Sequence, residues 1–177
     1  MERVLVIGPC GAGKSTLSVE LGCRLGLPVH HIDQLHWHPG WVEGSSDELR
    51  ARLDAIVAGE RWIIDGNYGG TMAARLMRAD TVVYLDYPIL LCLRRLLGRI
   101  WTYRGRTRPD MTGGCPERFD LAFFLYVLMW NRGPRLRTEE KLKNFNGRLV
   151  RLAGSKALAR WLAALPRQDG RTEPRNV

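Results

Sequence analysis

Hydrophobic positions along the chain change spacing repeatedly, and each change predicts a new structural element. Apolar residues three or four positions apart predict amphipathic helices, and in the first of them Leu17, Leu21 and Leu25 share one face. Short β-branched runs between the helices are typical of buried strands. The expected strands are residues 3–7, 27–33, 62–65, 81–86 and 148–152, and the expected helices are residues 14–25, 47–58, 71–77, 88–103, 119–130, 138–145 and 155–165.

The alternation of strands with helices predicts an α/β fold, a three-layer sandwich in which helices cover both faces of a five-stranded parallel sheet. The 177 residues, of which 45 % are hydrophobic, suit one domain over residues 1–165, followed by a flexible tail over residues 166–177. Asp47 and Ser155 are expected to cap the helices that they begin.

The best-defined motif spans residues 8–15, Gly-Pro-Cys-Gly-Ala-Gly-Lys-Ser, which fit the phosphate-binding loop (P-loop) pattern G-x-x-x-x-G-K-[ST]. A strand precedes it and a helix follows, which is the context that such a loop requires. The lysine of the pattern can reach the β- and γ-phosphates, and its serine can bind Mg²⁺. The motif predicts ATP and Mg²⁺ as ligands, held by Gly8, Gly11, Ala12, Gly13, Lys14, Ser15 and Thr16.

Acidic residues end three of the predicted strands, at the edge where parallel sheets bind ligands. Asp65 ends a buried strand beside the P-loop strand and can hold a water bound to Mg²⁺. Asp33 is expected to face the γ-phosphate, where a carboxylate can accept the proton of a substrate hydroxyl. For both, a purely structural role in a turn or strand end is the alternative. Asp86 precedes Tyr87-Pro88 and is expected to cap the next helix.

The positive charge is concentrated in one segment. Residues 88–151 hold 14 basic and 5 acidic residues and so account for the whole formal charge of +9. Arg95 and Arg99 share a helix face that leads into a loop over residues 104–118. We interpret this loop as an arginine-rich lid, containing Arg104, Arg106 and Arg108, that closes over the triphosphate. Arg99 would stabilise charge during the reaction together with Lys14. A nucleic-acid surface or a solvated basic helix are the alternatives.

Aromatic and histidine residues are concentrated after Asp33. His30, His31, His36 and His38 do not match a standard zinc spacing, so a metal site is the weaker interpretation. With Trp37 and Trp41 this segment is better explained as a wall of an acceptor pocket. Arg75 could bind an anionic acceptor group, as could Arg50 or Arg52. The run containing Phe123, Phe124, Tyr126 and Trp130 is expected to be core.

Composition excludes some classes of protein. Cys10, Cys23, Cys92 and Cys115 show no C-x-x-C spacing, which favours reduced thiols in a cytoplasmic protein. Apolar stretches such as residues 121–130 are shorter than the ~20 residues that span a bilayer. No signal peptide pattern precedes the P-loop. We therefore expect no association with a membrane.

These motifs resemble those of P-loop small-molecule kinases of the adenylate kinase and shikimate kinase type. Residues 95–99, Arg-Leu-Leu-Gly-Arg, resemble the lid entrance of adenylate kinases, which implies that Arg95 covers the adenine and Arg99 contacts phosphate. Asp65-Gly66 is similar to a strand end of the same enzymes, but Asn67-Tyr68-Gly69 follows instead of Phe-Pro-Arg. Asp33-Gln34 resembles the acceptor-binding aspartate of shikimate kinases, where His31 replaces a second aspartate.

Over nearly the whole chain, the order of motifs resembles bacterial proteins labelled DNA topology modulation (FlaR-like). The resemblance rests on Asp33 to Trp41, Trp62 to Tyr68, Arg104 to Asp110 and Gly114 to Asp120. No helix-turn-helix, zinc finger or basic-aromatic strand pattern accompanies it.

Three hypotheses follow. The leading one is an ATP- and Mg²⁺-dependent phosphotransferase that acts on a small molecule or nucleotide, with Lys14, Asp33 and Arg99 as catalytic residues. The second is a nucleotide-binding regulator associated with DNA, whose affinity would depend steeply on salt. The third is an ATP-binding switch without transfer activity.

Overall fold

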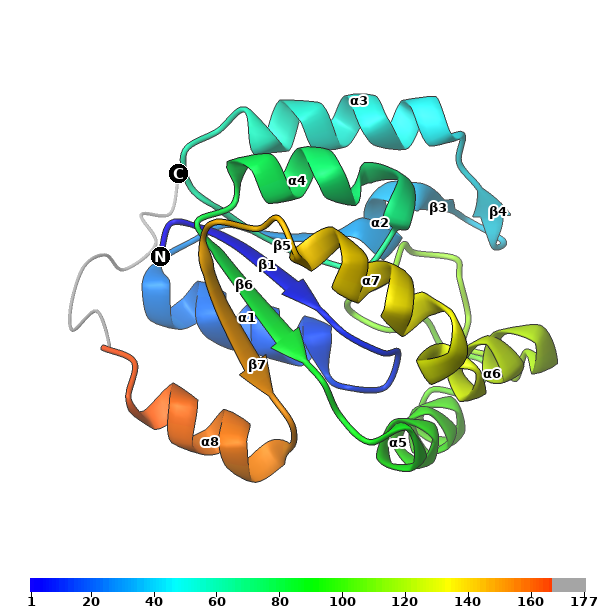
Figure 1. Ribbon diagram of the computed structural model, residues 1–177. Helices are drawn as coiled ribbons and strands as arrows, with labels where there is room; N and C mark the ends of the chain where they lie inside the picture. Colours follow the sequence, from blue (N-terminus) through cyan, green and yellow to red (C-terminus); the bar gives the residue numbers. More distant parts are fainter. Residues whose placement is uncertain (167–177) are drawn as a thin grey trace, which may run out of the picture.

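Five parallel strands form the centre of the computed structural model, which describes residues 1–166 (Figure 1). Their order in the sheet is β2 (Val29–His31), β5 (Trp62–Asp65), β1 (Arg3–Ile7), β6 (Thr81–Leu85) and β7 (Arg148–Leu152). Every neighbouring pair is parallel. The predicted α/β fold is therefore confirmed, and Asp65 does end a strand that pairs with the P-loop strand.

Alternating side chains of the central strands divide the core into two layers. Val4 and Val6 of β1 pack toward α1 (Lys14–Leu25) and α8 (Ser155–Ala163). Leu5 and Ile7 pack toward α3 (Ser46–Val57), α4 (Met72–Arg78) and the end of α7 (Pro134–Leu142). Helices consequently cover both faces of the sheet (Figure 1).

Three elements lie beyond the carboxyl ends of the strands: α5 (Ile89–Thr102), α6 (Leu121–Leu128) and the short 3-10 helix η2 (Trp130–Arg132) (Figure 1). A small core of its own joins the two helices through Leu93, Leu96 and Val127. The loop between α5 and α6 corresponds to the predicted lid, so the lid is fixed at both ends to a packed helix pair.

The segment around Asp33 differs from its prediction. The strand ends at His31, and residues 32–36 form a short helix, α2 (Ile32–His36), so that Asp33 lies in a helical turn. A hairpin of β3 (Trp37–His38) and β4 (Val42–Glu43) follows within the predicted loop. The predicted strand was too long because only three residues pair with β5.

Three helix boundaries also differ. Ser45 caps α3 by accepting a hydrogen bond from the Glu48 amide, at 3.1 Å, so Asp47 lies in the first turn instead. Helix α7 begins at Pro134, because proline is well tolerated in a first helical turn. Gly154, rather than Ser155, precedes α8. The short 3-10 helix η1 (Gly69–Thr71) leads into α4.

Asp86 does not cap α5 as expected. Its carboxylate instead pairs with Arg135 at 2.9 Å and Arg151 at 3.1 Å, which connects β6 to α7 and β7. The predicted flexible tail lies outside the described residues from residue 167 onward. In the described part of the chain, no helix combines the length and hydrophobicity needed to cross a membrane.

Candidate active site

The P-loop connects β1 to α1 and is shaped by its glycines. Gly8 and Gly11 adopt φ angles of 140° and 82°, which favour glycine. A Cβ added at Gly8 would lie 2.5 Å from the Leu85 carbonyl oxygen, and one at Gly11 would lie 2.3 Å from that of Cys92. The loop is thus packed against β6 and α5, with no space for a side chain at either position.

Lys14 and Asn67 close the P-loop from two sides. The Lys14 ammonium donates to the carbonyl oxygens of Gly8 and Pro9, at 3.1 and 3.3 Å. The Asn67 amide accepts from the Gly8 N–H at 3.1 Å and donates to the Gly8 carbonyl at 2.8 Å. The loop after β5 therefore fixes the position of the first P-loop residue.

A cleft of about 1360 Å³ opens above the P-loop. Its walls come from the strand ends, the lid and helices α5, α6 and α7. The predicted site residues that line it are Gly11, Ala12, Gly13, Lys14, Ser15, Thr16, Asp33, Trp37, Asp65, Arg95, Arg99 and Arg108. Residues that are far apart in the sequence thus meet where phosphates would bind.

Asp33 lies in the cleft and accepts a hydrogen bond from the Tyr68 hydroxyl at 3.0 Å. Burial raises the pKa of Tyr68, and the neighbouring Asp33 carboxylate raises it further, so the phenol stays protonated and remains a donor. This bond fixes one oxygen of Asp33 and leaves the carboxylate able to take a second partner from the cleft.

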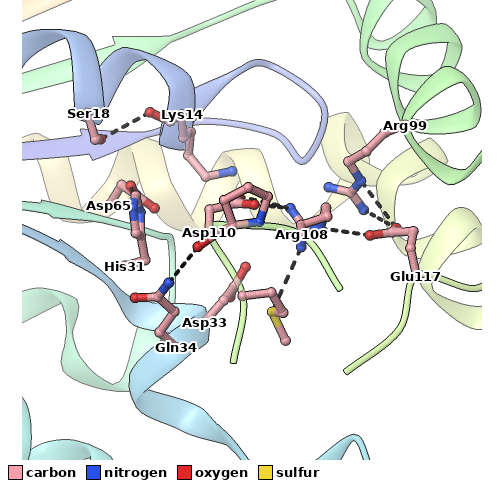
Figure 2. A network of polar contacts seen from close by, with 12 residues as sticks. Lys14, Ser18, His31, Asp33, Gln34, Asp65, Arg99, Arg108, Asp110 and Glu117 are labelled. Atoms are coloured by element: carbon pink, nitrogen blue, oxygen red, sulfur yellow. Dashed lines mark hydrogen bonds and ion pairs between the residues drawn. The ribbon is translucent and has the colours of Figure 1, made fainter. Parts of the chain in front are cut away.

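Asp65 and His31 form a buried pair at the ends of neighbouring strands (Figure 2). His31 Nδ1 lies 2.6 Å from Asp65 Oδ2. Desolvation lowers the pKa of His31, but the hydrogen bond and charge of Asp65, with Asp110 and Asp33 nearby, outweigh it and raise the pKa overall. One oxygen of Asp65 is consequently engaged by an imidazole that tends to carry positive charge.

This pair predicts a pH-dependent contribution to stability. Because the folded-state pKa of His31 is raised above 6.5, its contribution is fully present below about pH 6.5 and is lost as pH rises through the folded-state pKa. We expect His31→Gln to lower the melting temperature more at about pH 6 than at about pH 9. Thermal unfolding followed by circular dichroism measures this, and Asp65→Asn should show the same trend. A loss that grows with pH would contradict the assignment.

Asp110 brings a lid carboxylate into the same part of the cleft, near His31 and Lys14 (Figure 2). Arg108 Nη1 donates to it at 2.9 Å. Burial raises the pKa of Asp110, but Arg108, the Ser15 hydroxyl and His31 together lower it. Asp110 is therefore ionised beside the serine of the P-loop.

Glu117 connects Arg99, near the end of α5, with Arg108 of the lid (Figure 2), and both arginines line the cleft. Its Oε1 accepts from Arg99 Nη2 at 2.9 Å and from Nε at 3.2 Å. Its Oε2 lies 2.7 Å from Arg108 Nε, a charge contact that lacks hydrogen-bond geometry. Glu117 is 5 % exposed. A single buried carboxylate thus holds both guanidinium groups at the lid end of the cleft.

Arg95 lies at the opposite side of the P-loop. Its guanidinium donates to the Ala12 carbonyl at 3.3 Å and to the Ser155 hydroxyl at 3.0 Å. It also lies over the Tyr87 ring, 5.3 Å from the centroid. This arrangement leaves Arg95 beside an aromatic and apolar part of the cleft, in a position suited to a nucleobase.

Several predicted residues lie elsewhere. Arg104 and Arg106 are exposed and do not line the cleft. Arg75 is fully buried outside the cleft and donates to the carbonyls of Gly66, Asn67 and Tyr68, so it supports this loop rather than an acceptor. Burial lowers its pKa to about 10. Arg50 and Arg52 are exposed on α3.

The aromatic run of α6 and η2 only partly forms a core. Phe123 and Phe124 pack against the core between α5 and α6, and Trp130 is buried, as predicted. Phe123, Tyr126 and Trp130 also line the cleft. Only part of the histidine and tryptophan segment belongs to the cleft. His31, Trp37 and Trp41 line it, whereas His36 pairs with Glu43 and His38 pairs with Glu48. Within residues 1–166 no group of three or more His, Cys, Asp or Glu side chains is arranged to hold a metal.

Four residues with polar contacts in the site had no predicted role: Asn67, Tyr68, Asp110 and Glu117. Asn67 and Tyr68 lie two and three positions after Asp65, and this short spacing was the available signal. Asp110 and Glu117 lie within the predicted lid, but their pairing with arginines depends on the path of the loop.

Comparison with known proteins agrees with this fold. A family model described as "AAA domain" matches residues 4–112, from β1 to the lid. A curated shikimate kinase from Baumannia cicadellinicola subsp. Homalodisca coagulata is 29 % identical over 133 residues, which cover 66 % of this chain and 73 % of that protein.

Two solved structures share the fold. The shikimate kinase from Acinetobacter baumannii, solved in complex with shikimate, has a TM-score of 0.59 and 18 % identity, and the match covers 92 % of this chain and 89 % of that one. The shikimate kinase from Bacteroides thetaiotaomicron has a TM-score of 0.56 and 15 % identity, with 92 % and 94 % covered.

Proposed function

We propose that this chain, which belongs to the AAA domain family, is an ATP-dependent phosphotransferase that transfers the γ-phosphate to the hydroxyl of a small molecule. The observation that carries the proposal is the position of Asp33. Its carboxylate lies in the cleft that the P-loop lysine also lines, and Tyr68 fixes one of its oxygens. The fold shared with shikimate kinases supports the same class of reaction.

The reaction assigns a role to each part of the cleft. The acceptor hydroxyl forms a bond to the γ-phosphorus while the bond from that phosphorus to the bridging oxygen of ADP breaks. Asp33 orients the hydroxyl and accepts its proton. Lys14, Arg99 and Arg108 stabilise negative charge on the transferred group. In the resting lid, Glu117 keeps both arginines at this end of the cleft.

The oxygen donors near the phosphates fit Mg²⁺, which prefers carboxylate, hydroxyl and water ligands. We expect Ser15 to bind the ion directly. Asp65 would act through a bound water, because His31 engages one of its two oxygens. The ion would neutralise phosphate charge. Since the described residues provide no complete protein cage, it would be shared with the nucleotide.

The distribution of arginines favours transfer over DNA binding. Five arginines of this segment line the cleft: Arg95, Arg99, Arg108, Arg118 and Arg137. Arg135 and Arg151, from the same basic segment, are paired with acidic side chains. More than half of the twelve arginines in residues 88–151 are therefore directed at the cleft or neutralised, which leaves little for a duplex.

A transfer assay tests the proposal. The full chain is incubated with γ-labelled ATP, Mg²⁺ and a panel of nucleosides, sugars, amino alcohols and ring alcohols. We expect label to pass to one acceptor class at a rate well above hydrolysis. If nucleotide binds but no member of a broad panel is labelled, the alternative of an ATP-binding switch would replace this proposal.

A further inference from the structure

Aromatic side chains line the acceptor part of the cleft from two sides. Trp37 and Tyr68 belong to the wall that carries Asp33, and Tyr126 and Trp130 belong to α6 and η2. The two sides are connected by α7, because Lys141 donates to the carbonyl of Gly69, the residue after Tyr68, and the Tyr126 and Trp130 rings form an edge-to-face pair with centroids 6.4 Å apart. Aromatic surfaces on two sides suit a planar ring.

Trp130 is buried beside this pocket. The residue is 1 % exposed, and its indole Nε1 has no partner among the residues that the structure describes. Buried donors normally find a partner, because an unsatisfied one costs free energy. Because this N–H is itself inaccessible, Trp130 contributes aromatic surface rather than a hydrogen bond to the pocket.

Positive charge lies on the helix next to this pocket. One face of α7 lines the cleft through four residues spaced three or four positions apart: Pro134, Arg137, Thr138 and Lys141. Arg137 is close enough to Tyr126 to oppose the rise in the pKa of that phenol. In residues 1–166 the ion pairs of this region involve Arg135 and Arg151, and Arg137 has no acidic partner.

We infer that the acceptor is an aromatic alcohol that carries an anionic group. The inference rests on the proposed function and names the substrate class of the same site. Asp33 holds the hydroxyl, the aromatic walls hold the ring, and Arg137 with Lys141 binds the anion. In the reaction only the hydroxyl changes: its oxygen gains the phosphoryl group, its proton passes to Asp33 and ADP leaves. The anionic group stays intact.

Three matched probes test this class by calorimetry on the full chain, saturated with Mg²⁺ and a non-hydrolysable ATP analogue. They are 4-(hydroxymethyl)benzoate, the corresponding benzamide, and 4-(hydroxymethyl)cyclohexanecarboxylate. We expect the benzoate to bind about tenfold more tightly than the amide, because charge-assisted hydrogen bonds are lost. We expect it to bind about fivefold more tightly than the saturated ring, because stacking is lost.

An arginine variant assigns the charge effect to α7. Arg137→Gln should reduce the preference for benzoate over benzamide to about twofold. Arg132→Gln is the matched control, since Arg132 is an exposed arginine of the same segment that does not line the cleft, and it should keep the full preference.

Any of three results would overturn the inference: equal affinity for the three probes, failure of all three probes to bind, or an unchanged preference for benzoate over benzamide in Arg137→Gln. Binding is measured without turnover, and binding of the ATP analogue is titrated separately. Failure of the acceptor class is therefore distinguishable from failure of the proposed function, which the transfer assay decides.

Discussion

Replacement of Asp33 by asparagine should lower kcat for phosphoryl transfer about 10³-fold and leave the affinity for ATP nearly unchanged. The amide oxygen can still accept the hydrogen bond that Tyr68 donates at 3.0 Å, so the local structure should persist. An amide cannot take the proton of the acceptor hydroxyl. Transfer of label from γ-labelled ATP measures kcat, and titration with an ATP analogue measures affinity.

A carboxylate on the surface provides the control. Asp54 is exposed on α3, and Asp54→Asn should leave both quantities unchanged. The kcat of Tyr68→Phe should lie between those of Asp33→Asn and Asp54→Asn, because Asp33 loses the hydroxyl that fixes it but keeps its charge. Full transfer activity in Asp33→Asn would show that another group accepts the proton, and the proposed role of Asp33 would be wrong.

The second large effect is expected at Glu117. Glu117→Gln removes the charge that holds Arg99 and Arg108, while the replacement keeps nearly the same shape. Two arginines that are no longer held should reach the transferred phosphoryl group less often, which we expect to lower kcat/KM about 10²-fold. Steady-state kinetics with the acceptor identified by the transfer assay measure this.

The same change should also lower the free energy of unfolding, by about 2 kcal/mol, since two partly buried arginines lose their partner. Urea denaturation measures this. Glu140 pairs with Lys143 on the surface, so Glu140→Gln should change neither activity nor stability appreciably. Wild-type kcat/KM in Glu117→Gln would show that the arginines find the phosphate without it.

The parts of the site that depend on local sequence were predictable. The P-loop needs glycine at Gly8 and Gly11 for reasons confined to one turn and its immediate packing. The sheet could be predicted from the hydrophobic pattern, because short, continuous apolar runs between amphipathic helices indicate parallel strands that are buried on both faces. The carboxylate of Asp65 could be placed beside the P-loop for the same reason.

The parts that depend on loop paths were not predictable. Ile32 continues the apolar pattern of β2, yet the chain turns into a helix there, since β5 pairs with only three residues of the strand. His31 and Asp65 come together only through strand register. Glu117 meets Arg99 although the two lie 18 positions apart, a separation that no short-range pattern encodes.

The close contact at Gly11 also determines where the lid could be exchanged for that of another protein. The P-loop turn at Gly11 lies directly against the Cys92 carbonyl, and Arg95 of the same helix donates to the Ala12 carbonyl. These contacts join the P-loop to α5, so we expect the two to move together. We therefore expect any movement of the lid to begin after Thr102, where α5 ends. Gly105 follows with a φ of 70°, a conformation that favours glycine. A chimaera that takes its lid from a related protein should therefore be joined after Thr102. The P-loop and α5 then come from the same protein, and their contacts are preserved.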